Sequence, residues 1–348
     1  MFLPHTHGGA LFLAILSLVC LGSWPNLYKL AGKWRFELFY FDFAIGLMLT
    51  ATIAALTLGS LGFDGFGLGD DLANAGKRQW MFAFLAGTVF NLGNMLLVAA
   101  MSVAGMAVAF VAGTGMMLLV AMLTGLLQGS RVDTTSVWFA CGFFLAAIVA
   151  AALAYGALAR ARRAALPRDP KTGRKARGPG AVKGIVLALT GGAITLGMYP
   201  LVAFATPPEI GLGPYGMLML FGFGVLISTV VCNIFFMNLP VAGEPLEIFD
   251  YLKGRPTIHL FGLAAGLVWY AGMLSNRLVG TVPPKQQLAA PLALGLPNSG
   301  LLLAALWGTL AWREFRGAGA LGKTMAALML VLAAGGLWMM SMAVAPLK

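Results

Sequence analysis

The amino-acid sequence predicts an all-α membrane protein whose ten transmembrane helices form two inverted five-helix repeats. The first observation is composition, since 59% of the residues are hydrophobic, 10% are charged and the mean hydropathy is +0.87. A soluble core cannot hide that much apolar surface, and a bilayer does not need it hidden. The second is an echo: LGSWP at 21–25 returns as LGMYP at 196–200, each near the end of the apolar run that opens one half of the chain. Membrane proteins with helix-breaking residues at matching points of two halves most often move solutes.

Apolar runs of about 20 residues mark the helices, because that length crosses the hydrocarbon core of a bilayer. In chain order, the ten predicted spans are 8–30, 36–58, 80–101, 104–128, 136–159, 182–204, 213–236, 257–278, 287–312 and 320–344. The ninth contains Pro291 and Pro297, which interrupt helical hydrogen bonding. The first run has neither a basic leader nor a small-residue cleavage site, so we expect a retained helix and not a signal peptide.

Lysine and arginine residues predict the orientation. Of the 23, 17 fall in alternate loops, nine of them between Arg160 and Lys183. By the positive-inside rule these loops face the cytoplasm, so both termini are expected to be extracytoplasmic. The net charge of +11 is thus a topology signal beside anionic lipid, and nucleic acid is not expected as a partner. Ala- and Gly-heavy usage is typical of bacteria, which predicts the cytoplasmic (inner) membrane.

The basic stretch also divides the chain. It separates a first five-helix repeat at 1–160, a basic cytoplasmic linker at 161–181 and a second five-helix repeat at 182–348. With an odd number of helices in each half, the second half must insert upside down, so the repeat is an inverted one. A further echo supports this division, because GTVFNLG at 87–93 in the third span resembles GLVWYAG at 266–272 in the eighth.

Polar residues at membrane depth form the candidate site, because every polar group in lipid needs a partner. Asn91 and Asn94 lie about one helical turn apart and therefore share a face. The aromatic residues beside the two echoing prolines can line a cavity and stack on a ring-shaped ligand. The predicted substrate-binding residues are Trp24, Asn91, Asn94, Tyr199, Tyr270, Asn276 and Asn298. The same residue types also serve to tie helices together or to pack against a kink, which is the alternative interpretation.

Signals for bond-making chemistry are poor. Acidic residues are nearly absent from helix centres, so a coupling proton would use an interfacial acid such as Asp42, or else the protein is an uncoupled facilitator. Cys20, Cys141 and Cys232 form no close pair, so neither disulfides nor metal sites are expected. His259 is interpreted as a structural histidine. The sequence lacks metalloprotease, nucleophile-elbow and phosphate-loop motifs, so we expect neither an enzyme nor a cofactor.

Several segments together carry a resemblance to a known family. They are GGA at 8–10 with LGSWP at 21–25, FDF at 41–43, and WG at 307–308 followed by EFR at 314–316. With these segments the chain resembles the ureide permease family of the drug/metabolite transporter superfamily. The resemblance implies a ten-helix carrier with five-plus-five inverted repeats that imports ureides such as allantoin or nucleobases such as uracil, with proton coupling in plant members. It also places Asn276 and Asn298 where plant sequences have glutamines.

We therefore expect a permease that moves a small neutral polar ring solute by alternating access. Amides and hydroxyls can replace the solute's hydrogen bonds to water, and a cavity almost without acids offers nothing to neutralise a cation. A sugar permease of the same superfamily, like the glucose, ribose or rhamnose porters, would need the same groups. A membrane-embedded lipid enzyme would have to use His259 with Glu244, Glu247 and Asp250. An uncoupled channel or lipid scramblase would show no saturation.

Overall fold

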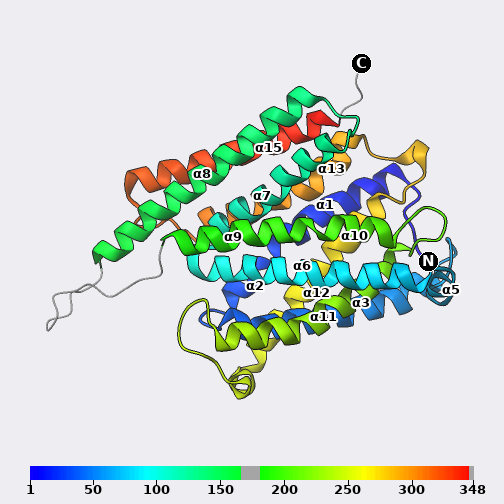
Figure 1. Ribbon diagram of the computed structural model, residues 1–348, viewed down its shortest axis with the longest axis horizontal. Coiled ribbons are helices and arrows are strands. Elements are labelled where there is room, and N and C mark those ends of the chain that lie inside the picture. The colour runs from blue at the N-terminus through cyan, green and yellow to red at the C-terminus, as the bar shows by residue number, and fades with distance from the viewer. Residues whose placement is uncertain (166–180, 345–348) are drawn as a thin grey trace. The chain divides into compact units, whose positions relative to one another are not determined.

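The structure is a computed structural model that describes residues 1–165 and 181–344. All regular secondary structure in these two ranges is helical (Figure 1). The elements in chain order are α1 (His7–Ser23), α2 (Pro25–Leu30), α3 (Phe36–Leu56), α4 (Leu58–Leu61), α5 (Leu68–Asn74), α6 (Lys77–Ala104), α7 (Met106–Leu127), α8 (Thr134–Ala165), α9 (Ala181–Leu196), α10 (Met198–Ala205), α11 (Pro214–Asn238), η1 (Ile248–Lys253), α12 (Pro256–Val279), η2 (Pro284–Gln286), α13 (Ala290–Asn298), α14 (Gly300–Leu306), η3 (Trp307–Ala311) and α15 (Gly319–Ala343).

The predicted all-α membrane fold is confirmed, because ten helical segments of the described chain are long and apolar enough to cross a membrane. The ends differ from the predicted spans by a few residues. Helix α8, for example, continues past the predicted end at 159 to Ala165. Its last turns carry Arg160, Arg162 and Arg163. These residues are compatible with a helix but are not apolar, so hydropathy did not mark them as part of the span. Of the predicted linker 161–181, the ends thus belong to α8 and α9, and 166–180 lie outside the described residues.

Three of the spans are broken near a proline. The first consists of α1 and α2 and breaks just before Pro25. The sixth consists of α9 and α10 and breaks shortly before Pro200, and the ninth breaks just after Pro297 between α13 and α14. Proline has no N–H to donate to the carbonyl four residues earlier, so each helix loses a backbone hydrogen bond at this point. The first and sixth breaks fall in the two echoing segments.

The chain forms two compact units, and each combines two separate stretches of the sequence. The first unit comprises Met1–Met95 and Ile194–Gly300, and the second comprises Leu96–Ala193 and Leu301–Lys348. In the first unit α12 packs against α1 and α3, and α11 also packs against α3. In the second unit α8 packs against α7 and lies along α15 (Figure 1). These compact units differ from the predicted repeats at 1–160 and 182–348, which are defined by the echoes in the sequence. The assignment of the repeats stays a prediction.

Glycines allow two close helix crossings in the first unit. At the α3–α12 crossing, a Cβ atom on Gly46 would overlap the backbone of Leu263 on α12. A Cβ atom on Gly266 of α12 would in turn overlap the backbone of Phe43 on α3. The two backbones therefore touch directly, as small residues permit in membrane helix pairs.

The α6–α11 crossing is built in the same way. A Cβ atom on Gly224 of α11 would overlap the backbone of Phe84 on α6, and one on Gly87 would overlap the backbone of Phe221 on α11. On every one of these four helices, the residue whose backbone contacts the partner's glycine lies three positions before the helix's own glycine. The pairs are Phe43 and Gly46, Leu263 and Gly266, Phe84 and Gly87, and Phe221 and Gly224.

In the second unit, a carboxylate far away in the sequence caps α7. Gly105 separates α6 from α7 and has a φ of 95°, which favours glycine. The Glu314 carboxylate accepts hydrogen bonds from the backbone N–H groups of Met106 and Ala107, at 2.8 and 2.9 Å. These groups have no acceptor within the helix, and a negative charge is favourable at a helix N-terminus. Gly308 leaves room for this carboxylate, since a Cβ atom there would lie 2.8 Å from its Oε2.

Candidate functional site

The predicted substrate-binding residues all belong to the first unit. Four of them are buried, with exposed fractions between 0% and 3%: Trp24, Asn91, Asn94 and Tyr270. Asn276 and Asn298 are half-buried. The Asn298 amide donates to the carbonyl of Leu294 in its own helix at 2.8 Å. Tyr199 is 44% exposed, and its role in binding stays a prediction.

The two asparagines of α6 face the interior of the first unit, as their spacing predicts. The Asn94 amide donates a hydrogen bond to the Tyr40 hydroxyl of α3 at 2.9 Å. The Thr229 hydroxyl of α11 donates to the Asn91 amide oxygen at 3.0 Å. Both contacts tie helices together, yet each amide has more donor and acceptor positions than these bonds use. The sequence did not identify Tyr40 as part of this site, because a single aromatic residue in an apolar helix carries no periodic signal.

Six residues of the first unit have a buried side-chain nitrogen or oxygen without a hydrogen-bond partner among the described residues: Ser17, Trp34, Asp71, Asn233, Tyr270 and Arg277. Two of them, Asn233 and Tyr270, are neutral groups of α11 and α12. Asn233 lies one turn after Thr229 on α11, is fully buried and uses neither its amide nitrogen nor its amide oxygen. The Tyr270 hydroxyl of α12 is also buried and unpartnered. Leaving such a group unsatisfied costs about 1–3 kcal/mol. Groups of this kind are unusual in folded proteins, and a ligand is one way to satisfy them.

Three aromatic rings contact Trp269 of α12, and a fourth, Trp24, reaches this group through Phe43. The rings of Phe90 and Trp269 lie 4.3 Å apart between centroids, and Phe221 stacks on Trp269 at 5.9 Å with an interplanar angle of 8°. Phe43 contacts Trp269 at 6.3 Å and Trp24 at 5.2 Å. Trp24 is thus packed against neighbouring rings at the break between α1 and α2. We call these five residues the aromatic cluster.

A signal for the aromatic cluster was present in the sequence. Phe90 and Trp269 hold the same position in the echoing segments GTVFNLG and GLVWYAG. Likewise, Asn91 and Tyr270 hold the next position. The structure brings these two equivalent rings into contact. The likeness of the two segments did not by itself indicate that contact.

An acidic residue is buried between α3 and α12, one helical turn before Gly46. Asp42 of α3 is 2% exposed, and one of its carboxylate oxygens accepts a hydrogen bond from the Tyr251 hydroxyl of η1. The other oxygen lies 2.9 Å from His259 Nδ1 of α12. Burial, followed by the hydrogen bond to Asp42, raises the pKa of Tyr251 above its usual value. His259 is therefore within hydrogen-bonding distance of a buried carboxylate, a contact that the sequence analysis did not anticipate. We call Asp42, Tyr251 and His259 the Asp42 cluster.

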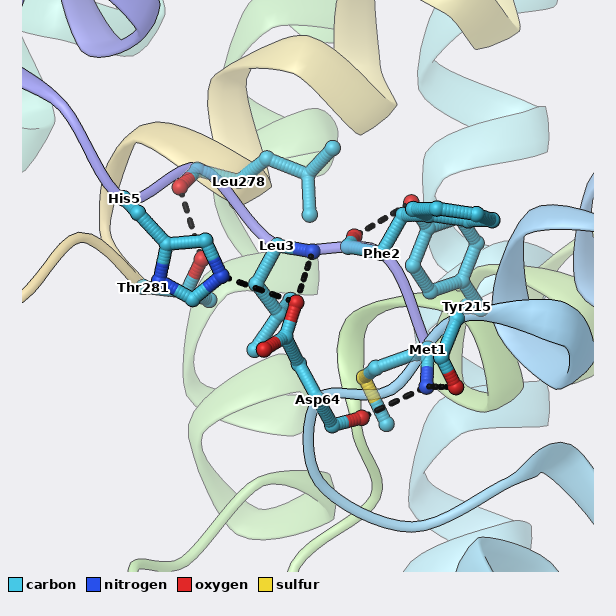
Figure 2. A network of polar contacts seen from close by, with 9 residues as sticks. Met1, Phe2, Leu3, His5, Asp64, Tyr215, Leu278 and Thr281 are labelled. Atoms are coloured by element: carbon cyan, nitrogen blue, oxygen red, sulfur yellow. Dashed lines mark hydrogen bonds and ion pairs between the residues drawn. The ribbon is translucent and has the colours of Figure 1, made fainter.

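The chain segment before α1 is held by a polar network (Figure 2). The Asp64 carboxylate lies 3.0 Å from His5 Nε2 and accepts from the backbone N–H of Leu3 at 3.1 Å. The Tyr215 hydroxyl of α11 donates to the carbonyl of Phe2 at 2.8 Å. The hydrogen bonds from His5 and Leu3 hold the pKa of Asp64 below its usual value. The network fastens residues 1–5 to the loop after α4 and to the start of α11.

A surface pocket of about 490 Å³ opens where α6 begins and α10 ends. Its polar groups are Arg78, Gln79 and Glu209, and its rings are Phe82 and Phe204 at 5.2 Å. The Arg78 guanidinium lies over the Phe82 ring at 5.5 Å. None of the predicted substrate-binding residues lines this pocket.

Comparison with known proteins finds three plant relatives of part of this chain. Ureide permease 1 of Arabidopsis thaliana is 28% identical over 142 residues, which is 40% of this chain and 36% of the relative. Ureide permease 4 of the same plant is 27% identical over 155 residues (42% and 38%), and ureide permease 2 is 32% identical over 114 residues (31% and 28%). The matches span about a third of the length of these relatives, and no family model matches the chain. This multi-pass membrane protein is thus similar to ureide permeases over about two fifths of its length.

Proposed function

We propose that this protein is a permease that moves a small neutral polar ring solute across the membrane by alternating access. The solute class is a nucleobase or a ureide such as uracil or allantoin, and the protein is not an enzyme. The observation that carries the proposal is the buried core of the first unit, where amides and hydroxyls with unused hydrogen-bonding capacity accompany an aromatic cluster. The partial similarity to proteins named ureide permeases supports the same solute class.

The chemistry of these groups favours a neutral ring. The unpartnered Asn233 amide offers one donor group and one acceptor, and the Tyr270 hydroxyl can do either. A nucleobase or ureide presents the complementary N–H and C=O groups around a flat ring. Stacking on aromatic side chains would then compensate the loss of water on its faces. A free cation would instead need a fixed negative charge, which amides and hydroxyls do not supply.

The two glycine crossings support the inverted repeat that alternating access requires. In the proposed repeat, the second and third spans correspond to the seventh and eighth, so Gly46 corresponds to Gly224 and Gly266 to Gly87. Each of these glycines meets the backbone of the equivalent partner helix, with the same three-residue spacing. Phe90 and Trp269, also equivalent, meet each other, as residues close to a two-fold axis do. Rocking of one repeat against the other is the usual mode of such carriers.

The proposal includes orientation and driving force. The positive-inside rule places the cationic loops in the cytoplasm and both termini outside, and the composition favours a bacterial inner membrane. A proton is the proposed coupling ion, because the buried acid Asp42 is a group that can bind one.

The test is counterflow in liposomes that contain the purified protein. We expect saturable counterflow of labelled uracil or allantoin that glucose and ribose do not inhibit. Asn94→Leu and Asn298→Leu should each lower the rate by about fivefold or more, because an exchanged hydrogen bond contributes about 1 kcal/mol. Asn238→Leu is the matched control, since this amide is exposed at the end of α11.

Two results would count against the proposal. Counterflow of glucose or ribose in place of the ring solutes would favour a sugar permease. Flux without saturation would favour a channel or scramblase.

A further inference from the structure

The Asp42 carboxylate and its two partners come from three separate elements. Asp42 belongs to α3, Tyr251 to η1 and His259 to α12. The sequence separates Asp42 from its two partners by 209 and 217 residues, so only the fold brings them together. Gly262 of α12 makes room for the acid, because a Cβ atom there would overlap the Cβ atom of Asp42. The site is thus built around one buried carboxylate.

Charged groups surround the Asp42 cluster without replacing its partners. On its own helix, Glu37 is fully buried and paired with Arg35 at 2.6 Å. On η1, Asp250 is paired with Lys253 at 2.6 Å. The remaining cations of these elements are Lys29 of α2 and, on α12, Arg255 at its start and Arg277 near its end, and α11 and α4 carry neither acidic nor basic residues. Glu37 and Asp250 are thus each paired with a cation, Glu247 before η1 is exposed, and the polar partners of Asp42 are His259 and Tyr251.

The partners of Asp42 suit a proton and not a metal ion. A hydroxyl and an imidazole N–H donate to the carboxylate, whereas a sodium or calcium ion would need several oxygen atoms that accept. Among residues 1–165 and 181–344, no group of three or more His, Cys, Asp and Glu side chains could hold a metal. The imidazole also offers a route for the proton. The His259 side chain is 21% exposed, and its Nε2 faces Gly254 just beyond η1.

We propose that the Asp42 cluster is the proton-binding site of this protein, and that proton binding there drives solute uptake. The inference rests on the proposed function as a permease. A proton from water adds to the Asp42 carboxylate, which becomes a neutral carboxyl group, so the charge of the Asp42–His259 pair rises by one. The carboxylate then loses strength as the acceptor for Tyr251, so η1 is held less firmly to α3. The charge change at one end of α3 and α12 is thereby linked to a movable segment.

The first experiment separates proton coupling from solute binding. Liposomes with the purified protein are assayed for counterflow of labelled uracil without a pH gradient, and for uptake with the outside one pH unit more acidic. For one proton per solute, this gradient drives roughly tenfold accumulation in the wild type. We expect Asp42→Asn to keep counterflow within about twofold and to lose the accumulation, since coupling energy acts only on the gradient-driven step. Asp250→Asn is the matched control, because it removes a half-buried carboxylate that is next to Tyr251 in the sequence and does not contact Asp42, and it should keep both activities.

Gradient-driven accumulation by Asp42→Asn at the wild-type level would overturn the inference. Wild-type protein that shows counterflow but no gradient-driven accumulation would overturn it as well. His259→Gln and Tyr251→Phe extend the test if Asp42→Asn is poorly folded, and both are expected to lower the accumulation ratio while counterflow continues.

The second experiment does not depend on transport. The Trp34 and His259 rings meet edge to face at 5.9 Å, so Trp34 fluorescence reports a change of charge in the Asp42–His259 pair. We expect a pH-dependent change of emission that Trp34→Phe and Asp42→Asn remove and Asp250→Asn retains. If this titration is present but counterflow is absent for every solute, the permease function fails and the proton site stands. If the titration is unchanged in Asp42→Asn, the proton site is wrong whatever the transport assays give.

Discussion

The two glycine crossings of the first unit have the same packing and different chemistry. At the α3–α12 crossing the polar groups are ionisable, with Asp42 held by His259 and Tyr251. At the α6–α11 crossing they are neutral, with Asn91 bonded to Thr229 and Asn233 unpartnered. Close backbone contact is thus common to both crossings, whereas the polar side chains beside it are ionisable at one and neutral at the other. In our proposals, one crossing handles the proton and the other the solute.

The difference can be traced to single positions. Asp42 lies four residues before Gly46, and the equivalent position before Gly224 is Leu220. Across the crossing, Gly262 makes room for the acid, whereas the residue equivalent to it on α6 is Ala83. An acid at 220 would therefore face a methyl group. The pocket for a buried carboxylate exists at one crossing only.

The largest expected effect comes from breaking the common packing. Gly46→Ala and Gly224→Ala each force a Cβ atom into a neighbouring backbone and should destabilise the protein by about 1–3 kcal/mol or more. Thermal unfolding of each variant in detergent measures the loss. Gly142→Ala is the control, because a Cβ atom there meets nothing within 4 Å. If one crossing tolerates alanine and the other does not, the two are not equivalent.

A smaller effect separates stability from transport at α11. Asn233→Leu replaces a buried amide that has no partner in the described chain, so it should stabilise the protein by about 1–2 kcal/mol. The same change should abolish counterflow of uracil, because it removes the proposed solute contact. Melting temperature and counterflow are measured on the same preparation. Asn238→Leu should change neither, and a variant that is both stabilised and fully active would remove Asn233 from the site.

The smallest effect lies outside both crossings, at the network in Figure 2. The pKa of Asp64 is lowered in the folded state from 3.8. Its stabilising contribution is therefore complete above pH 3.8 and is lost as the pH falls through the lower folded value. Because the Asp64 side chain is partly exposed to solvent, at 28%, Asp64→Asn should lower the melting temperature only slightly at pH 7. Melting temperatures of variant and wild type should converge as the pH falls below 3.8, and a gap that widens with acidity would contradict this assignment.

The sequence allowed prediction of the helices and of part of the site. Hydropathy located the ten spans, and the 3.6-residue period put Asn91 and Asn94 on one buried face. It could not find Tyr40 or Thr229 as their partners, because a hydrogen bond between helices depends on how they cross. For the same reason it treated His259 as a lone residue, since the contact with Asp42 joins positions 217 residues apart. The charged end of α8 was missed because arginines continue a helix that hydropathy no longer marks.

The carboxylate of Glu314 changes how the similarity to ureide permeases is best interpreted. It belongs to the segment at 307–316 that carries part of the resemblance, and it holds the first turn of α7 at Gly105. Glutamate at this position is thus a requirement of the polypeptide's architecture. Proteins that carry unrelated cargo on the same scaffold would keep it equally well. Searches for residues that select the cargo are better directed to the amides of α11 and α12 than to this helix cap.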